Sequence, residues 1–175
     1  MIIKRIFILL LFVLPVFYSC NPPANKPERP GNPYFSTTDT GKLDVPDAEW
    51  KKILPADLYA VAREKATEKA FTGKYNRSNT RGTYYCAVCG NKLFLSDAKF
   101  ESTCGWPSFF EPVRTSSITY QPDTSHGMVR TEVNCGRCGS HLGHIFDDGP
   151  PPTYKRFCMN SISLDFDSSG TVNKN

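Results

Sequence analysis

The rhythm of apolar and polar positions changes several times along the chain of 175 residues. An almost unbroken apolar run covers residues 6–18, and a proline-rich stretch without apolar periodicity follows it. We expect two helices next, over 48–54 and 55–69, because apolar residues recur there at helical spacing and Pro55 suits a first helical position. From Thr83 onward, short runs rich in aromatic and β-branched residues are broken by Gly and Pro, which predicts antiparallel strands with many turns.

The amino terminus has the pattern of a secretory signal, with basic Lys4 and Arg5 before the apolar run. Thirteen apolar residues are too few to cross a bilayer as a helix. The run ends at Ser19 and Cys20, which resembles the lipobox of bacterial lipoproteins, although Phe17 replaces the usual Leu. We therefore predict a signal peptide over 1–19 and lipidation of Cys20, which would anchor the protein on the extracytoplasmic side of a bacterial membrane. An ordinary cleaved signal, giving a soluble secreted or periplasmic protein with a stray thiol, is the alternative.

The segment after Cys20 predicts a spacer between the anchor and a folded domain. Five prolines stand among the thirteen residues 21–33, so this stretch suits neither a helix nor a central strand. We expect a tether over 20–43, one domain over 44–168 and a short tail over 169–175. A plain disordered leader would have the same composition as the tether.

Composition and charge narrow the class of protein. With 39% apolar and 13% aromatic residues, a domain of this size can build a hydrophobic core. The formal charge of +4 falls to about +2 when Lys4 and Arg5 leave with the signal, so no nucleic-acid partner is expected. Seven cysteines are too few for a disulfide-built miniature scaffold.

Two Cys-x-x-Cys-Gly units, at 86–90 and 135–139, indicate a metal site. Glycine after the second cysteine allows the positive φ of a tight turn. Four thiolates suit one closed, tetrahedral structural zinc per chain, which would join two distant hairpins. A redox Cys-x-x-Cys pair or two disulfides are the competing interpretations, because an exported protein can hold disulfides. The predicted zinc ligands are Cys86, Cys89, Cys135 and Cys138.

A further cysteine, Cys158, stands in a setting that favours a nucleophile. In a regular strand Arg156, Cys158 and Asn160 share one face. The neighbouring positive charge favours the thiolate form of Cys158. The simpler interpretation of a lone strand cysteine, a small buried hydrophobe, leaves the flanking polar residues without a purpose.

Two histidines, His141 and His144, follow the second cysteine unit. They could satisfy hydrogen bonds in the core or bind the metal. Four thiolates already complete a tetrahedral zinc site, so at least one imidazole is free to act as an acid near neutral pH.

Several segments in collinear order over residues 46–166 resemble peptide-methionine (R)-S-oxide reductase, the B type of methionine sulfoxide reductase. They are Tyr59-x-Val61-x-Arg63-x-Lys65, Thr67-Glu68, Phe71-Thr72-Gly73-Lys74-Tyr75, Cys104-Gly105-Trp106-Pro107-Ser108-Phe109, His141-Leu142-Gly143-His144-Ile145-Phe146, and the run from Arg156 to Leu164. Ala66 and the pair Lys69-Ala70 depart from the family pattern, outside the segments with chemistry.

The resemblance implies a reaction and roles for its residues. Cys158 would attack the sulfur of oxidised methionine in a protein or peptide, with His144 as proton donor, His141 beside it and Asn160 holding water or substrate. The resulting sulfenic acid would condense with Cys104, and a thioredoxin-like dithiol protein would reduce the disulfide.

The resemblance also implies the pocket and the fold. Trp106 would line an apolar pocket for the substrate methyl group, whereas Phe146 suits either that pocket or core packing. The implied fold is mainly β, with two antiparallel sheets, short amino-terminal helices and a structural zinc, and nothing in the pattern demands more than a monomer. Two other classes remain as alternatives: a zinc-ribbon-like binding module without turnover, and a general disulfide reductase that uses a Cys-x-x-Cys pair.

Overall fold

The computed structural model describes residues 31–168. The predicted signal peptide, the lipidation site Cys20 and the tail over 169–175 lie outside the described residues. Within 31–168, no helix is long and apolar enough to cross a membrane.

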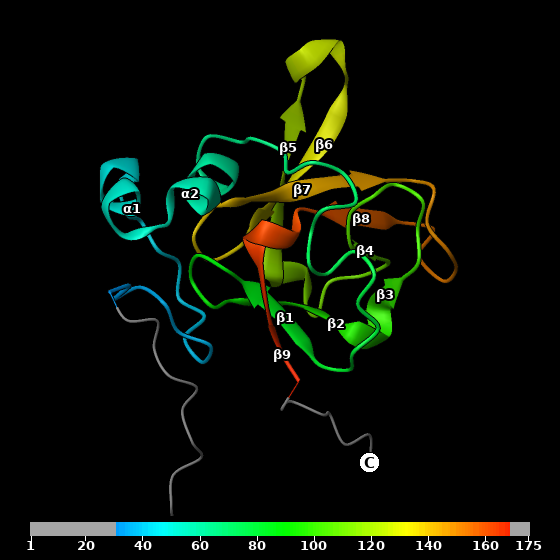
Figure 1. Ribbon diagram of the computed structural model, residues 1–175, viewed down its shortest axis with the longest axis horizontal. Coiled ribbons are helices and arrows are strands. Elements are labelled where there is room, and N and C mark those ends of the chain that lie inside the picture. The colour runs from blue at the N-terminus through cyan, green and yellow to red at the C-terminus, as the bar shows by residue number, and fades with distance from the viewer. Residues whose placement is uncertain (1–30, 169–175) are drawn as a thin grey trace, which may run out of the picture.

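Two antiparallel sheets form the centre of the fold, as predicted (Figure 1). One sheet has the strand order β2-β1-β9 and the other β3-β4-β8-β7-β6-β5. The strands are β1 (Thr83–Cys86), β2 (Lys92–Leu95), β3 (Lys99–Phe100), β4 (Ser108–Phe109), β5 (Ile118–Asp123), β6 (Arg130–Cys135), β7 (His141–Phe146), β8 (Arg156–Met159) and β9 (Leu164–Asp167). Short 3-10 turns cover Ser96–Ala98, Thr115–Ser117, Ser125–Gly127 and Ser161–Ser163. The mainly β fold class is thereby confirmed.

The core lies between the two sheets. Phe94 on β2 stacks on Phe109 of β4, with ring centroids 4.4 Å apart and an interplanar angle of 13°. Tyr84 on β1 meets the same ring edge-on at 5.0 Å. Because aromatic side chains bury a large area and prefer these geometries, the three rings fix how the small sheet sits on the large one.

Two helices precede the sheets, α1 (Asp47–Ile53) and α2 (Ala56–Ala62). The prediction that the second helix reaches residue 69 is wrong. Lys65 has a φ of 60°, a left-handed conformation that reverses the chain after the helix. Glycine or asparagine usually marks such a stop, so a lysine gave no warning of it in the sequence. Pro55 is also not the first helical residue but the extended residue before it, with a ψ of 143°.

Residues 31–43 lie against the domain, although we expected them to belong to a tether. Asn32 Nδ2 donates to the carbonyl of Val88 at 2.8 Å, and Ser36 N donates to Cys89 O at 3.0 Å. The phenyl ring of Phe35 is buried. We call this segment the strap. Its backbone groups and its aromatic ring have partners in the domain, so the strap packs as part of it.

Candidate active site and metal centre

Strand β8 divides its residues between the core and the site. Phe157 and Met159 are buried, while Arg156 and Cys158 alternate with them and are partly exposed on the opposite face. Cys158 pairs with Ser108 of β4 on one side and with His144 of β7 on the other. This register carries the loop before β4, which contains Cys104, onto the exposed face of Cys158.

Cys104 and Cys158 come together, with their Sγ atoms 3.3 Å apart. Ser102 Oγ lies 2.9 Å and Ser108 Oγ 3.3 Å from the sulfur of Cys104. The two hydroxyl groups hold the loop thiol over the strand thiol. At this separation a disulfide between the two cysteines needs only a small approach of the loop.

The two thiols share a proton. The hydrogen bond from Cys158 lowers the pKa of Cys104 to about 4. The same contact, together with burial, raises the pKa of Cys158, and the neighbouring charge of Arg156 opposes that rise. The pair therefore carries one negative charge near neutral pH and titrates as a unit. We expected a thiolate on Cys158 alone, but the sequence did not show that a second sulfur would share it.

Arg156 is fixed beside the thiols by a carboxylate. Its Nε and Nη2 donate to the two oxygens of Asp148 at 2.8 and 2.9 Å, a bidentate pair. This hydrogen bonding lowers the pKa of Asp148. The guanidinium also stacks over the ring of Phe146, 4.3 Å from its centroid. Phe146 thereby belongs to the site and not to the core.

His144 is oriented by the end of β5. Its Nε2 lies 2.7 Å from Oδ2 of Asp123, and Arg130 Nη2 donates to the same oxygen at 2.7 Å. Hydrogen bonds, first from Ser125 and also from His144 and Arg130, lower the pKa of Asp123. An ionised carboxylate at this position fixes the orientation of the imidazole ring.

His141 belongs to a separate, buried pair. Its Nδ1 lies 2.7 Å from Oε1 of Glu132, whose other oxygen accepts from Lys65 Nζ at 2.8 Å. Burial, the largest influence, would raise the pKa of Glu132, but the hydrogen bonds from Lys65 and His141 outweigh it and lower the pKa overall. For His141, burial is again the largest influence, and here it lowers the pKa, because burial disfavours the charged imidazolium. The two histidine rings meet edge to face with centroids 5.4 Å apart.

The loop after α2 closes the site through Glu68. Its backbone N–H donates to Asn160 Oδ1 at 3.0 Å, and its carboxylate accepts from the N–H groups of Ser161 and Ile162 at 2.7 and 3.0 Å. Trp106 Nε1 donates to the carbonyl of Glu68 at 3.2 Å. Glu68 thus fixes the amide on one wall of the site and the indole on another.

These elements enclose a small hollow of about 90 Å³, which we call the reaction pocket. Trp106 and Phe146 supply its apolar walls, and Cys158, His144 and Asn160 supply its polar groups. Thr67, Arg130 and Gly143 complete the lining. Its volume suits a group the size of a methyl sulfoxide, with the thiol, imidazole and amide around it.

The four cysteines of the two Cys-x-x-Cys-Gly units form a buried cluster whose sulfurs all lie within 4.8 Å of one another. The Sγ atoms of Cys86 and Cys138 are 3.7 Å apart, and those of Cys89 and Cys135 are 3.6 Å apart. Four Zn–S bonds of about 2.3 Å in a tetrahedron require sulfurs ~3.8 Å apart, so the cluster fits a zinc ion. The glycines that follow, Gly90 and Gly139, have φ of 78° and 70°, as the sequence predicted.

Arg137, inside the second unit, ties the strap to the cluster. Its buried guanidinium donates to the carbonyls of Cys89, Tyr34 and Gly41 and forms a 2.6 Å ion pair with Asp39. The strap passes so close that a Cβ on residue 90 would lie 2.6 Å from the carbonyl oxygen of Ser36. One cation therefore joins both cysteine units to the amino-terminal segment.

Sequence reasoning did not find the carboxylates that organise the site. Each acts on a partner in another element, and none carries a local pattern of its own. They are Glu68, Asp123, Glu132 and Asp148. The pair Asp147-Asp148, which directly follows the segment 141–146, was the one sequence feature that could have drawn attention to Asp148.

Comparisons with known proteins give the family of this chain. The SelR domain model matches residues 54–168. Peptide methionine sulfoxide reductase MsrB of Agrobacterium fabrum is 51% identical over 133 residues, covering 76% of this chain and 98% of the relative. The MsrB proteins of Pseudomonas putida and Leptospira interrogans are each 53% identical over 125 residues, covering 71% of this chain and 94% and 95% of theirs. The chain therefore belongs to the family of peptide methionine sulfoxide reductases of the B type.

Proposed function

We propose that this enzyme reduces the R epimer of methionine sulfoxide in proteins, with Cys158 as nucleophile and Cys104 as resolving thiol. The contact between their two sulfurs, of which that of Cys158 belongs to the lining of the reaction pocket, is the observation that carries the proposal. A pocket with one small apolar end and one thiol end suits a methyl sulfoxide better than a larger or fully polar substrate.

Substrate orientation follows from the walls of the pocket. Trp106 and Phe146 receive the S-methyl group, and the sulfoxide oxygen then lies toward His144 and Asn160. Because the sulfoxide sulfur is a stereocentre, an apolar wall and a donor wall in fixed positions accept one epimer and place the oxygen of the other against the indole.

The first chemical step transfers oxygen from substrate to enzyme. His144, with one ring nitrogen on Asp123, donates the proton of its other nitrogen to the sulfoxide oxygen, and Cys158 attacks the sulfur. The attack forms a bond between the two sulfurs. The oxygen, which now carries the proton from His144, then passes from the methionine sulfur to Cys158 as the sulfur–sulfur and old sulfur–oxygen bonds break, so that methionine leaves and Cys158 becomes a sulfenic acid. Methionine gains two electrons and the cysteine sulfur loses two. The charge of Arg156 favours the thiolate form of Cys158, whose proton passes to Cys104 across the contact between the two sulfurs.

The second step removes the sulfenic acid. Cys104 attacks the sulfur of Cys158, water leaves, and a disulfide forms. A thioredoxin-like protein then supplies two electrons by thiol–disulfide exchange. Cys104 also lines a second hollow of about 600 Å³, with Glu101, Asp148 and Arg156, which Cys158 does not line. The reductant can therefore reach Cys104 from the side opposite the reaction pocket.

The four-cysteine cluster has a structural role in this proposal. Cys86, Cys89, Cys135 and Cys138 would hold zinc, which with four protein ligands has no open position and supplies only cohesion. The ligands come from the ends of β1 and β6 and the turns that follow them, so the metal fastens the small sheet to the large one.

The cellular setting remains part of the proposal. The basic start, the apolar run and Cys20 support export and lipid anchoring of a monomer on the extracytoplasmic side of a membrane. The mass of the amino-terminal peptide of the mature protein tests this, because acylation of Cys20 adds the mass of its lipid.

Reduction of separate R and S epimers by the purified enzyme with dithiothreitol tests the proposal. We expect turnover of the R epimer alone, its loss in Cys158→Ser, and a retained first turnover in Cys104→Ser. Full activity in Cys158→Ser, or equal turnover of both epimers, would contradict it.

A further inference from the structure

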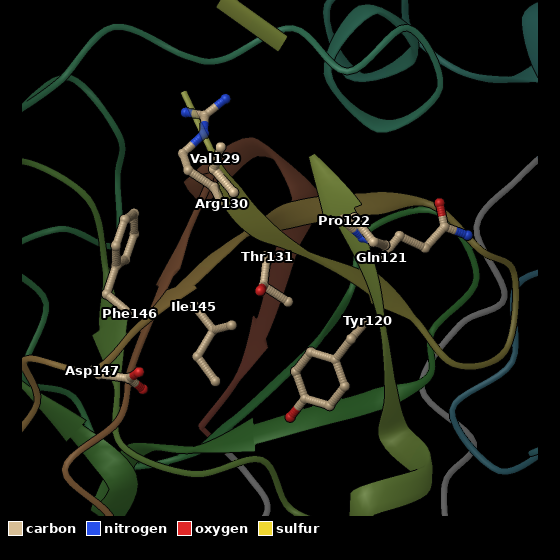
Figure 2. Close-up of a pocket in the computed structure, with 9 residues that line it drawn as sticks. All are labelled: Tyr120, Gln121, Pro122, Val129, Arg130, Thr131, Ile145, Phe146 and Asp147. Atoms are coloured by element: carbon tan, nitrogen blue, oxygen red, sulfur yellow. The ribbon is translucent and has the colours of Figure 1, made fainter. Parts of the chain in front are cut away.

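A third hollow, of about 510 Å³, lies on the opposite face of the large sheet from the catalytic side chains (Figure 2). Tyr120 of β5, Thr131 of β6 and Ile145 of β7 point into it, whereas the side chains of Arg130 and Phe146 point away on the other side (Figure 2). We call this hollow the outer groove. Its size falls in the range of ordinary ligand sites.

The register of the strands explains why this groove is open. Thr131 pairs with Ile145, and two residues further along, on the same face, Val133 pairs with Gly143. Val133 is fully buried, because the core covers the face there, but Thr131 is exposed. The β5–β6 hairpin projects beyond the body of the protein (Figure 1). The outer groove is thus the part of the core-facing surface that the small sheet does not reach.

Apolar side chains gather at this groove. Five large hydrophobic residues are exposed among residues 31–168, and three of them, Tyr120, Met128 and Val129, belong to the β5–β6 hairpin. Val129 is 91% exposed and Tyr120 is 50% exposed, and both line the groove. Such a group is more typical of a binding surface than of an inert one.

The groove is continuous with the reaction pocket. Arg130 is the first residue of β6 and Phe146 is the last residue of β7. Both residues line the outer groove as well as the reaction pocket. A chain that leaves the reaction pocket can therefore pass over this end of the sheet and reach the other face. Since stacked sheets pack about 10 Å apart, side chains reach about 5 Å from the backbone on each face of a sheet, and sites on its two faces lie about 10 Å apart. An extended chain covers about 3.4 Å per residue, so about three residues complete the passage.

We propose that the outer groove is a subsite for the protein substrate, and that it takes an apolar or aromatic side chain about three residues from the oxidised methionine. The inference rests on the proposed function, because the groove acts only on a chain whose methionine occupies the reaction pocket. The occupant is an extended polypeptide segment whose apolar side chain packs on Tyr120, Val129 and Ile145.

A second copy of this chain fits the groove less well. A stable dimer buries at least about 1,200 Å² in total, and the exposed apolar surface here comes from three side chains on one hairpin. A single side chain of a substrate needs far less area. The groove accordingly adds binding energy to polypeptides and none to free methionine sulfoxide.

Steady-state kinetics of the full chain with three substrates tests this inference. The substrates are N-acetylmethionine R-sulfoxide and two otherwise identical peptides, with the R-sulfoxide in the centre and either leucine or serine three residues to each side. The variants are Tyr120→Thr and Val129→Thr, which keep residues that suit strands. Tyr154→Asn, at an exposed tyrosine with a φ of 57° that asparagine tolerates, is the matched control.

The wild type should prefer the leucine peptide over the serine peptide by about fivefold or more in kcat/KM, mainly through KM. Tyr120→Thr and Val129→Thr should each remove most of that preference and leave N-acetylmethionine R-sulfoxide unchanged, whereas Tyr154→Asn should keep it. Equal kcat/KM for the two peptides in the wild type, or an undiminished preference in the variants, would overturn the inference. So would a change of sedimentation from dimer to monomer in Val129→Thr, which would assign the groove to a second copy.

Failure of the proposed function gives a different result. In that case N-acetylmethionine R-sulfoxide is not reduced at all, by the wild type or by any variant. Reduction of this small substrate without a peptide preference overturns the groove alone.

Discussion

The six cysteines in residues 31–168 fall into two groups that differ in their surroundings more than in their spacing from other sulfurs. In the metal cluster, four buried thiols face one another at 3.6–3.7 Å across the centre. At the active site, two partly exposed thiols lie 3.3 Å apart beside an arginine and two serines, and Cys158 lines the reaction pocket. Burial and number of ligands suit the first group to holding a metal, while exposure and a nearby cation suit the second to redox chemistry.

Removing one sulfur from each group should separate the two roles most strongly. Cys158→Ser should lower turnover by at least about 10³-fold, because the nucleophile is lost, yet leave the zinc content at one per chain. Cys86→Ser should lose the metal and much of the folded state, because metal binding contributes folding free energy. Activity, metal analysis and thermal unfolding measure both effects. A folded, zinc-free Cys86→Ser variant with wild-type stability would contradict the structural role of the metal cluster.

Cys104→Ser sharpens the comparison within the reactive pair. The enzyme should form one methionine per chain and then stop with a thioredoxin-like reductant, because no disulfide can form. Rapid-quench measurement gives the amount of methionine formed in the first turnover, and a longer assay gives the steady-state rate. Cys104→Ala is the control for the serine hydroxyl, and full steady-state turnover with the protein reductant in both variants would contradict the resolving role.

The pH dependence of alkylation should distinguish the groups next. Since the pKa of Cys104 is lowered to about 4, the pair holds a thiolate throughout the neutral range, and its reactivity should fall only as the pH drops toward about 4. Iodoacetamide labelling with peptide mapping should show fast reaction at Cys104 or Cys158 at pH 6. The four cluster cysteines of the zinc-loaded enzyme should remain unlabelled. A rate that rises only above pH 8 would contradict the shared thiolate.

The smallest expected effect concerns the strap. Arg137→Met keeps the length of the side chain but removes the donors to three backbone carbonyls. Hydrogen bonds of a charged donor contribute about 1–3 kcal/mol, so chemical denaturation should show a loss in that range with activity retained. Lys42→Met, at an exposed position of the strap, is the control. Unchanged stability in Arg137→Met would show that the strap adds nothing to the cluster.

Local patterns predicted those parts of the molecule whose causes are local. Alternation placed Arg156 and Cys158 on one face of a strand, and the Cys-x-x-Cys-Gly spacing indicated two tight turns, because both depend on neighbours two to four residues away. The end of the second helix was missed at Lys65, where the chain reverses at a residue with no turn preference. The strap was missed because the five prolines of residues 21–33 suggested a spacer, whereas the contacts of the strap come from Val88, Cys89 and Arg137.

The organising carboxylates could not be read from the sequence, since their partners are distant along the chain. Glu68 binds backbone groups 93 and 94 residues away, and Asp123 meets a histidine 21 residues away. Only the sheet register brings them together. The resemblance to a known family supplied the roles of Cys104 and Trp106, and the structure adds the serines and the Glu68 loop that hold them in place.

The most direct test of this account is a single turnover of the fully reduced enzyme with an R-sulfoxide peptide and no reductant, followed by mass spectrometry of the digested protein. We expect one methionine formed per chain and one new disulfide, between the peptides that contain Cys104 and Cys158. Methionine formation accompanied by a disulfide among Cys86, Cys89, Cys135 and Cys138, with Cys104 and Cys158 still reduced, would contradict it.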